Sequence, residues 1–67
     1  MQVRINGKPY DVPRKVSTLE DLLICMKLRK GNTLLKRNGH AVPRDMWPEV
    51  TVQEDDLIEM LILSSGG

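Results

Sequence analysis

The chain has 67 residues, which leaves room for one domain with a small hydrophobic core. Its ten basic and nine acidic residues are interspersed and give a net charge of +1, which excludes the basic stripe that phosphate backbones require. A single cysteine excludes an internal disulfide, and no apolar run approaches the roughly 20 residues of a membrane span. We therefore expect a soluble, cytoplasmic protein whose partners are neither nucleic acids nor membranes.

The N-terminal segment has the pattern of a β-hairpin. Residues 1–6 alternate apolar and polar side chains, which is typical of a half-buried strand. Asn6-Gly7 is a strong signal for a tight turn between two strands. The short strand expected around residues 10–12 is bracketed by Pro9 and Pro13, so we predict that it lies at an edge of the sheet.

Residues 18–30 have the pattern of an amphipathic helix. Two overlapping capping-box spacings open it, Ser17-x-x-Glu20 and Thr18-x-x-Asp21. One apolar stripe follows, at Leu19, Leu22, Leu23 and Met26, and Gly31-Asn32 offers a left-handed stop. Cys25 lies on the flank of this stripe, where a buried, inert thiol is favoured over a reactive one.

The second half of the chain predicts three more strands. Residues 33–37 and 40–42 flank a second Asn-Gly turn, Asn38-Gly39. Trp47 follows in an irregular segment, where it is expected to lie over one end of the core. The acidic residues 54–56 form a turn into the apolar strand 57–63.

This order of elements predicts an α+β fold of the β-grasp, or ubiquitin-like, type. Two hairpins flank one helix, which favours a mixed sheet of four to five strands with the helix packed on one face. The first and last strands then lie side by side and parallel, which places strand 57–63 at the centre. We expect residues 1–63 to form this domain and residues 64–67 to be a flexible Gly-Gly tail.

Alternation along the last strand predicts two faces. Ile58, Met60 and Ile62 should point toward the helix, while Leu57, Glu59, Leu61 and Leu63 share the outer face. Leu61 and Leu63 then form a contact surface for a partner beside the tail. Alternatively, the twist of the sheet or the loop around Trp47 covers them.

The sequence lacks the residue sets of a stand-alone enzyme or a metal protein. The single histidine, His40, sits beside a turn and is expected to face solvent. With one cysteine and one histidine there is no metal-ligand spacing, and the glycines at turns do not form a phosphate-binding loop. The acidic run 54–56 is interpreted as a turn because it lacks the alternating ligands of a calcium loop.

The C-terminal tail Ser64-Ser65-Gly66-Gly67 offers one reactive group, the α-carboxylate of Gly67. An α-carboxyl group has a reference pKa of about 3.5, so it is ionised at neutral pH and is a poor electrophile. It becomes reactive when a partner enzyme converts it to an acyl-adenylate. Glycine suits a tail that is threaded into a cleft because it lacks a Cβ, and Ser64 and Ser65 keep the tether small. The alternative is a frayed terminus without a role.

The chain resembles the sulfur-carrier proteins of the ubiquitin-like superfamily, and most closely the ThiS family of thiamine biosynthesis. The resemblance spans the whole chain and rests on the following residues: a strand ending at Asn6, the helix start Thr18-Leu19-Glu20-Asp21-Leu22-Leu23, Asn38-Gly39, Val42-Pro43-Arg44-Asp45-Met46-Trp47, and the terminal Gly66-Gly67. The Val-Pro-Arg-x-x-Trp segment is more similar to ThiS than to MoaD, the small subunit of molybdopterin synthase.

The resemblance implies that Gly67, preceded by Gly66, carries the chemistry. A ThiF-like, ATP-dependent enzyme would adenylate Gly67, a sulfur donor enzyme would supply the sulfur of a thiocarboxylate, and a ThiG-like thiazole synthase would accept it. Leu61, Leu63, Ser64 and Ser65 are the expected contacts with these partners. The adenylate and thiocarboxylate are transient modifications, so we expect no metal and no stably bound cofactor, and the protein would be a carrier substrate instead of an enzyme.

Two other functions stay open from the sequence. The chain could serve another sulfur pathway, of the molybdopterin type, or be conjugated to proteins as a modifier, because Gly-Gly is shared by all these carriers. A plain β-grasp interaction domain with an inactive tail is the third possibility.

Overall fold

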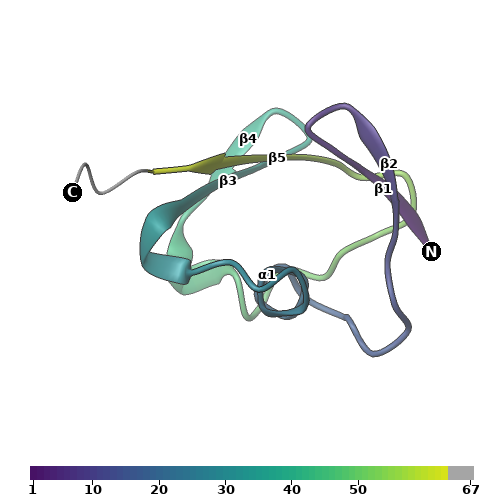
Figure 1. Ribbon diagram of the computed structural model, residues 1–67, viewed down its shortest axis with the longest axis horizontal. Helices are drawn as coiled ribbons and strands as arrows, with labels where there is room; N and C mark the ends of the chain where they lie inside the picture. Colours follow the sequence, from purple (N-terminus) through teal and green to yellow (C-terminus); the bar gives the residue numbers. More distant parts are fainter. Residues whose placement is uncertain (64–67) are drawn as a thin grey trace.

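The computed structural model describes residues 1–63, which form a sheet with one helix layer beneath it (Figure 1). This part of the chain contains five strands, one α-helix and two short 3-10 turns. In chain order they are β1 (Gln2–Ile5), β2 (Lys8–Asp11), α1 (Leu19–Cys25), η1 (Lys30–Asn32), β3 (Thr33–Arg37), β4 (His40–Val42), η2 (Arg44–Met46) and β5 (Leu57–Ile62).

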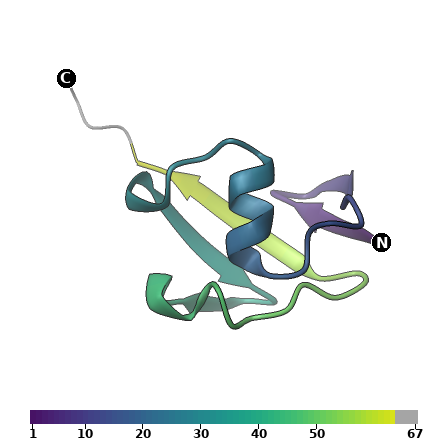
Figure 2. The same ribbon diagram turned by 90° about the horizontal axis from the view of Figure 1, so that it is seen from below.

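The strands form one mixed sheet in the order β2-β1-β5-β3-β4. β1 is parallel to β5, while the β1–β2, β3–β4 and β3–β5 pairs are antiparallel. β5 therefore lies at the centre, and α1 crosses one face of the sheet (Figure 2). The predicted β-grasp fold is confirmed, as is the edge position of the second strand.

Both hairpins turn at an Asn-Gly pair. The φ angles are 52° and 83° at Asn6 and Gly7, and 52° and 86° at Asn38 and Gly39. Positive φ at both central residues defines the type I′ turn, whose twist matches that of the flanking strands. Asparagine and glycine are the residues that adopt this conformation most easily, so the two turns follow directly from the sequence.

The helix begins at the predicted position. Thr18 is the N-cap: its hydroxyl accepts a hydrogen bond from the N–H of Asp21, and the carboxylate of Asp21 accepts one from the N–H of Thr18, both at 3.1 Å. This is one of the two capping boxes that the sequence offers. The N–H groups of Thr18 and Ser17 also hold the pKa of Asp21 below its ordinary value.

The prediction that the helix extends to residue 30 is wrong, because the chain leaves the helix at Lys27, where φ is 60°. The N–H of Lys27 donates to Ile24 O (2.9 Å) and that of Leu28 to Leu23 O (3.1 Å). These two bonds form a Schellman motif, which is usually made with glycine. Leu28 packs against the core, so this apolar contact ends the helix before Gly31 is reached.

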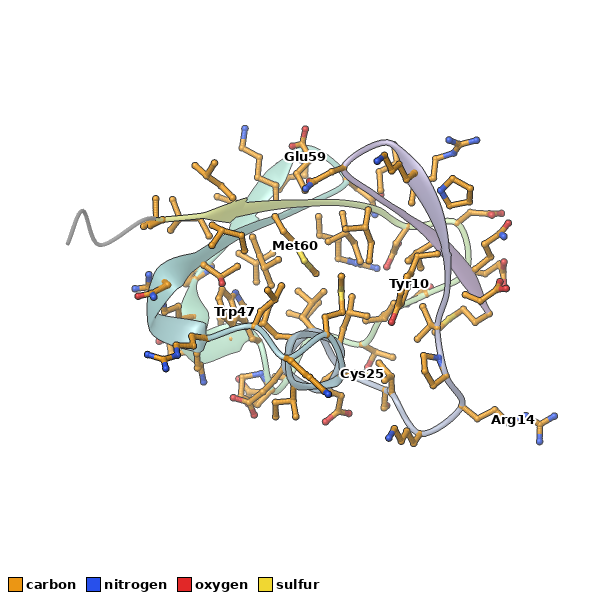
Figure 3. The ribbon with its side chains drawn as sticks, in the orientation of Figure 1. Tyr10, Arg14, Cys25, Trp47, Glu59 and Met60 are labelled. Carbon is orange, nitrogen blue, oxygen red and sulfur yellow. The ribbon has the colours of Figure 1, made fainter. Side chains whose placement is uncertain are left out.

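The hydrophobic core lies between the sheet and α1. The predicted stripe supplies Leu19, Leu22 and Leu23, which are buried, and Met26 packs against them. Trp47 is fully buried, and its indole N–H donates to Val42 O at 2.8 Å. Trp47 is therefore part of the core itself, where it packs between the sheet and the helix layer (Figure 3).

A buried carboxylate fixes the start of β5. Asp56 is 5% exposed and accepts hydrogen bonds from Arg37 Nε (2.8 Å), Asn38 Nδ2 (3.1 Å) and Gln53 N (2.9 Å). Burial alone raises the pKa of Asp56, but these bonds outweigh it and lower the pKa below its ordinary value. The acidic turn was predicted correctly, whereas the buried role of Asp56 was missed.

Asn38 connects this carboxylate to the strand. Its side-chain Oδ1 accepts from Leu57 N (2.9 Å), and its main-chain N–H donates to Leu57 O (2.7 Å). The turn between β3 and β4 is thereby attached to the first residue of β5. This contact fixes where β5 begins and hence which of its residues face the core.

Asp56→Asn should lower the stability at pH 7 by about 2 kcal/mol, or about 10 °C in melting temperature, because it weakens charge-assisted hydrogen bonds. Since the folded-state pKa is lowered, this stability is present above the unfolded pKa of about 3.9 and is lost as the pH falls through the folded value. Thermal unfolding at pH 7 and at pH 2 should therefore show the gap between the variant and the natural protein closing in acid.

Asp55→Asn is the matched control. Asp55 is exposed and has φ 65°, a conformation that asparagine tolerates, so this variant changes the same charge without touching the buried network. Equal melting temperatures for the two variants at pH 7 would contradict the role of Asp56.

Candidate functional site

The second half of β5 is where the sheet opens to solvent. β1 pairs with β5 only at Leu57 and Ile58, and then turns away at Asn6-Gly7. β3 accompanies β5 as far as Ile62. β5 therefore begins between two strands and ends beside one, at the margin of the described structure (Figure 1).

The side chains of β5 alternate as predicted through most of its length. Glu59 points away from the helix layer, and Met60 points into the core (Figure 3). Ile62 differs from the prediction: although alternation places it on the helix side, its side chain is 52% exposed. The reason is that β5 extends beyond the part of the sheet that α1 crosses (Figure 2).

Leu61 and Leu63 are 59% and 41% exposed, so the possibility that sheet twist or the Trp47 loop covers them is wrong. Leu34 of β3 lies directly opposite Leu61 and is 46% exposed. We call Leu34, Leu61 and Leu63 the outer apolar patch. It borders the cross-strand pair formed by Lys36 and Glu59, and an apolar surface with a polar rim is typical of a contact site.

The sequence does not single out Leu34, because residues 33–37 read Thr-Leu-Leu-Lys-Arg and do not alternate between apolar and polar side chains. In the structure Thr33 and Leu35 are buried, and Leu34 lies between them on the outer face. Only the register of β3 against β5 shows that Leu34 and Leu61 form one surface.

The end of β5 is held in place by η1. The N–H of Leu63 donates to Asn32 O (2.6 Å), and the guanidinium of Arg44 donates to the carbonyls of Lys30 (2.9 Å) and Gly31 (3.2 Å). The chain is therefore fixed as far as Leu63. The predicted tail residues Ser64, Ser65, Gly66 and Gly67 lie outside the described residues, so their roles and the domain boundary at residue 63 stay predictions.

The other candidate groups lie elsewhere. The thiol of Cys25 is half-buried, 4.0 Å from the hydroxyl of Tyr10, and burial together with this contact raises the pKa of Tyr10. His40 is exposed, as predicted. Among residues 1–63 no cluster of histidine, cysteine and carboxylate side chains could hold a metal ion, and no helix of this part of the chain has the length and apolar character to cross a membrane.

The described residues thus place the solvent-exposed end of β5 beside the outer apolar patch. Comparison with known proteins shows which family has this arrangement. The sequence profile of the ThiS family matches residues 3–67. The chain belongs to the ThiS family. The match covers nearly the whole chain, which confirms the resemblance drawn from the Asn-Gly, Val-Pro-Arg and Gly-Gly segments.

Two relatives show how this family occurs. The sulfur carrier protein ThiS of Bacillus subtilis is 26% identical over 65 residues, which cover 97% of this chain and 98% of that protein. A thiazole synthase of Magnetococcus marinus is 33% identical over 67 residues, which cover all of this chain and 20% of that protein. The chain therefore spans about a fifth of the length of the thiazole synthase.

A solved ThiS structure has the same fold. The crystal structure of the thiamine biosynthesis protein ThiS from Geobacter metallireducens is 29% identical, has a TM-score of 0.83 and covers 100% of both chains. The solution NMR structure of that protein gives a TM-score of 0.81 and covers 100% of this chain and 88% of that chain.

Proposed function

We propose that this protein is a sulfur carrier for thiazole formation in thiamine biosynthesis, with the sulfur bound at the carboxyl group of Gly67. The observation that carries the proposal is the family match, which extends to residue 67, combined with a central strand that leads to the four residues 64–67 at an open end of the sheet. The domain supplies recognition and position, and the terminal glycine supplies the reacting atoms.

The proposed reaction has two steps. A carboxylate oxygen of Gly67 attacks the α-phosphate of ATP, pyrophosphate leaves, and an acyl-adenylate forms. Sulfide released by a donor enzyme then attacks the acyl carbon, AMP leaves with the bond to the acyl carbon, and a proton is lost, so that Gly67 ends in a thiocarboxylate. Neither step needs a catalytic side chain of the carrier, which agrees with an exposed His40 and a half-buried Cys25.

The enzyme that adenylates Gly67 is expected to be ThiF-like, and thiazole synthase is expected to accept the sulfur. The Magnetococcus thiazole synthase supports the second partner, because it contains a segment similar to this whole chain within one polypeptide. Joining two proteins raises the effective concentration of one for the other. Such a fusion is therefore expected where a carrier delivers its cargo to the joined enzyme.

The outer apolar patch is the proposed docking surface for the adenylating enzyme. Leu61 and Leu63 lie immediately before the tail, so an enzyme that holds Gly67 must pass over them. Four extended residues span about 13 Å, which keeps the domain outside the active site while the carboxylate reacts inside.

Replacing either Leu61 or Leu63 by Asn should weaken binding of a ThiF-like enzyme about tenfold, since the interface loses buried apolar area and must desolvate a polar amide instead. The melting temperature should stay within a few degrees because both side chains are exposed. Leu57→Asn is the matched control, on the same face of β5 at its other end and 53% exposed. Comparable loss of binding in the control, or loss of folding at positions 61 and 63, would contradict the assignment.

Deleting Gly67 should leave the fold intact and abolish thiocarboxylate formation. The terminal carboxylate is then that of Gly66, which lies one residue too close to the domain to reach the active site of the adenylating enzyme. Intact-mass analysis after incubation with a ThiF-like enzyme, ATP and a sulfur donor reads this out as the gain from replacing oxygen by sulfur. Cys25→Ser should still show the full gain. A mass gain that persists after deletion of Gly67, or that is lost in the Cys25→Ser variant, would contradict the assignment of the sulfur to Gly67.

A further inference from the structure

One half of β5 has an unpaired edge. The peptide groups at the even-numbered positions of this region face β1: Asp56 O accepts from Arg4 N, and Ile58 O accepts from Asn6 N, both at 2.9 Å. After Asn6 the chain turns toward β2. The next even positions, Met60 and Ile62, therefore have no strand beside them on this side.

The side chain of Asn6 replaces a strand at Met60. Its Oδ1 accepts from Met60 N (2.8 Å), and its Nδ2 donates to Met60 O (3.1 Å). A carboxamide offers the same donor and acceptor as a peptide group, so Asn6 extends the β1–β5 ladder by one pair of bonds. The main-chain hydrogen-bonding groups on this edge of β5 therefore have partners as far as Met60.

The following position, Ile62, is open. The hydrogen bonds from β5 to the β3 side fall on odd-numbered residues: Leu57 O accepts from Asn38 N, and Leu63 N donates to Asn32 O. Ile62 lies opposite Thr33 and is therefore a pair without main-chain hydrogen bonds between its two members. Among residues 1–63 no hydrogen bond reaches the main-chain N–H or C=O of Ile62 from the β1 side.

The other sheet edges are protected, whereas this one is not. β2 contains Pro9 between charged and aromatic neighbours, and β4 has only three residues before Pro43. At the end of β5 the side chains of Leu61, Ile62 and Leu63 are all at least 41% exposed, without a charge or a proline among them. An open edge flanked by apolar side chains is suited to the addition of a strand from another protein.

We propose that an extended segment of thiazole synthase adds to this edge, hydrogen-bonding the main chain of Ile62 and packing apolar side chains against Leu61 and Ile62. The inference rests on the proposed function. Gly67 is four residues after Leu63, about 13 Å when extended, so an enzyme that takes Gly67 into its cleft lies beside Ile62.

Thiazole synthase is chosen over other tail-binding enzymes because the Magnetococcus protein keeps a segment similar to this chain in the same polypeptide.

Ile62→Pro tests the proposal, because it removes the N–H that faces the partner and no bond to β3. Ile62→Ala is the control, since it removes most of the side chain and keeps the N–H. Binding of purified thiazole synthase to the unmodified carrier should be about tenfold weaker for the proline variant than for the alanine variant, the loss expected for one hydrogen bond. Equal affinities of the two variants would overturn the proposal.

Amide hydrogen exchange on the natural protein gives a second test that needs no variant. In the free carrier the amide of Ile62 should exchange rapidly while that of Leu63 is protected by Asn32. Saturation with thiazole synthase should slow exchange at Ile62 at least tenfold. Unchanged exchange at Ile62 in a formed complex, or protection of Ile62 in the concentrated free carrier through self-association, would overturn the proposal.

Loading of the natural carrier with sulfur separates this inference from the proposed function. A carrier that gains sulfur at Gly67 while Ile62 stays unprotected in the complex would overturn the added strand alone. A carrier that never gains sulfur from a competent adenylating enzyme would overturn both.

Discussion

Strand β5 must be paired on both sides where it begins and on only one side where it ends, and the rest of the structure depends on this constraint. The contacts of Asp56 and Asn38 fix its first residue, and the side chain of Asn6 fixes its middle. A slip of one residue would exchange the two faces of the strand, so that Met60 would face solvent and Glu59 the core. Register is thus what places Leu61 on the outer face beside Leu34.

The division of work between the domain and the chain end follows from this geometry. The five strands and one helix enclose a single core on which β5 lies centrally, and the buried Trp47 is tied to β4 by its hydrogen bond to Val42 O. No step of the proposed chemistry requires a side chain of residues 1–63, and among these residues no cluster of histidine, cysteine and carboxylate side chains could hold a metal ion. In the proposed function the partner enzymes recognise the domain, and the chain end supplies the carboxylate.

Features encoded by neighbouring residues could be predicted from the sequence, and features that depend on distant residues could not. The Asn-Gly turns, the Thr18 cap and the alternation of β5 are local and were predicted correctly. The end of the helix was misplaced because burial of Leu28 outweighed the glycine signal at residue 31. The exposure of Ile62 and the roles of Asn6 and Asp56 depend on contacts between segments that lie far apart in the sequence, for which the local pattern carries no signal.

The proposed carrier function depends on activation of Gly67 by another protein, and ATP–pyrophosphate exchange measures that step most directly. A ThiF-like adenylating enzyme supplied with ATP, labelled pyrophosphate and this protein as the only carboxylate substrate should catalyse exchange that requires the carrier and saturates with its concentration. An enzyme that supports exchange with another ThiS-family carrier, but shows none with this protein, would contradict the proposed function.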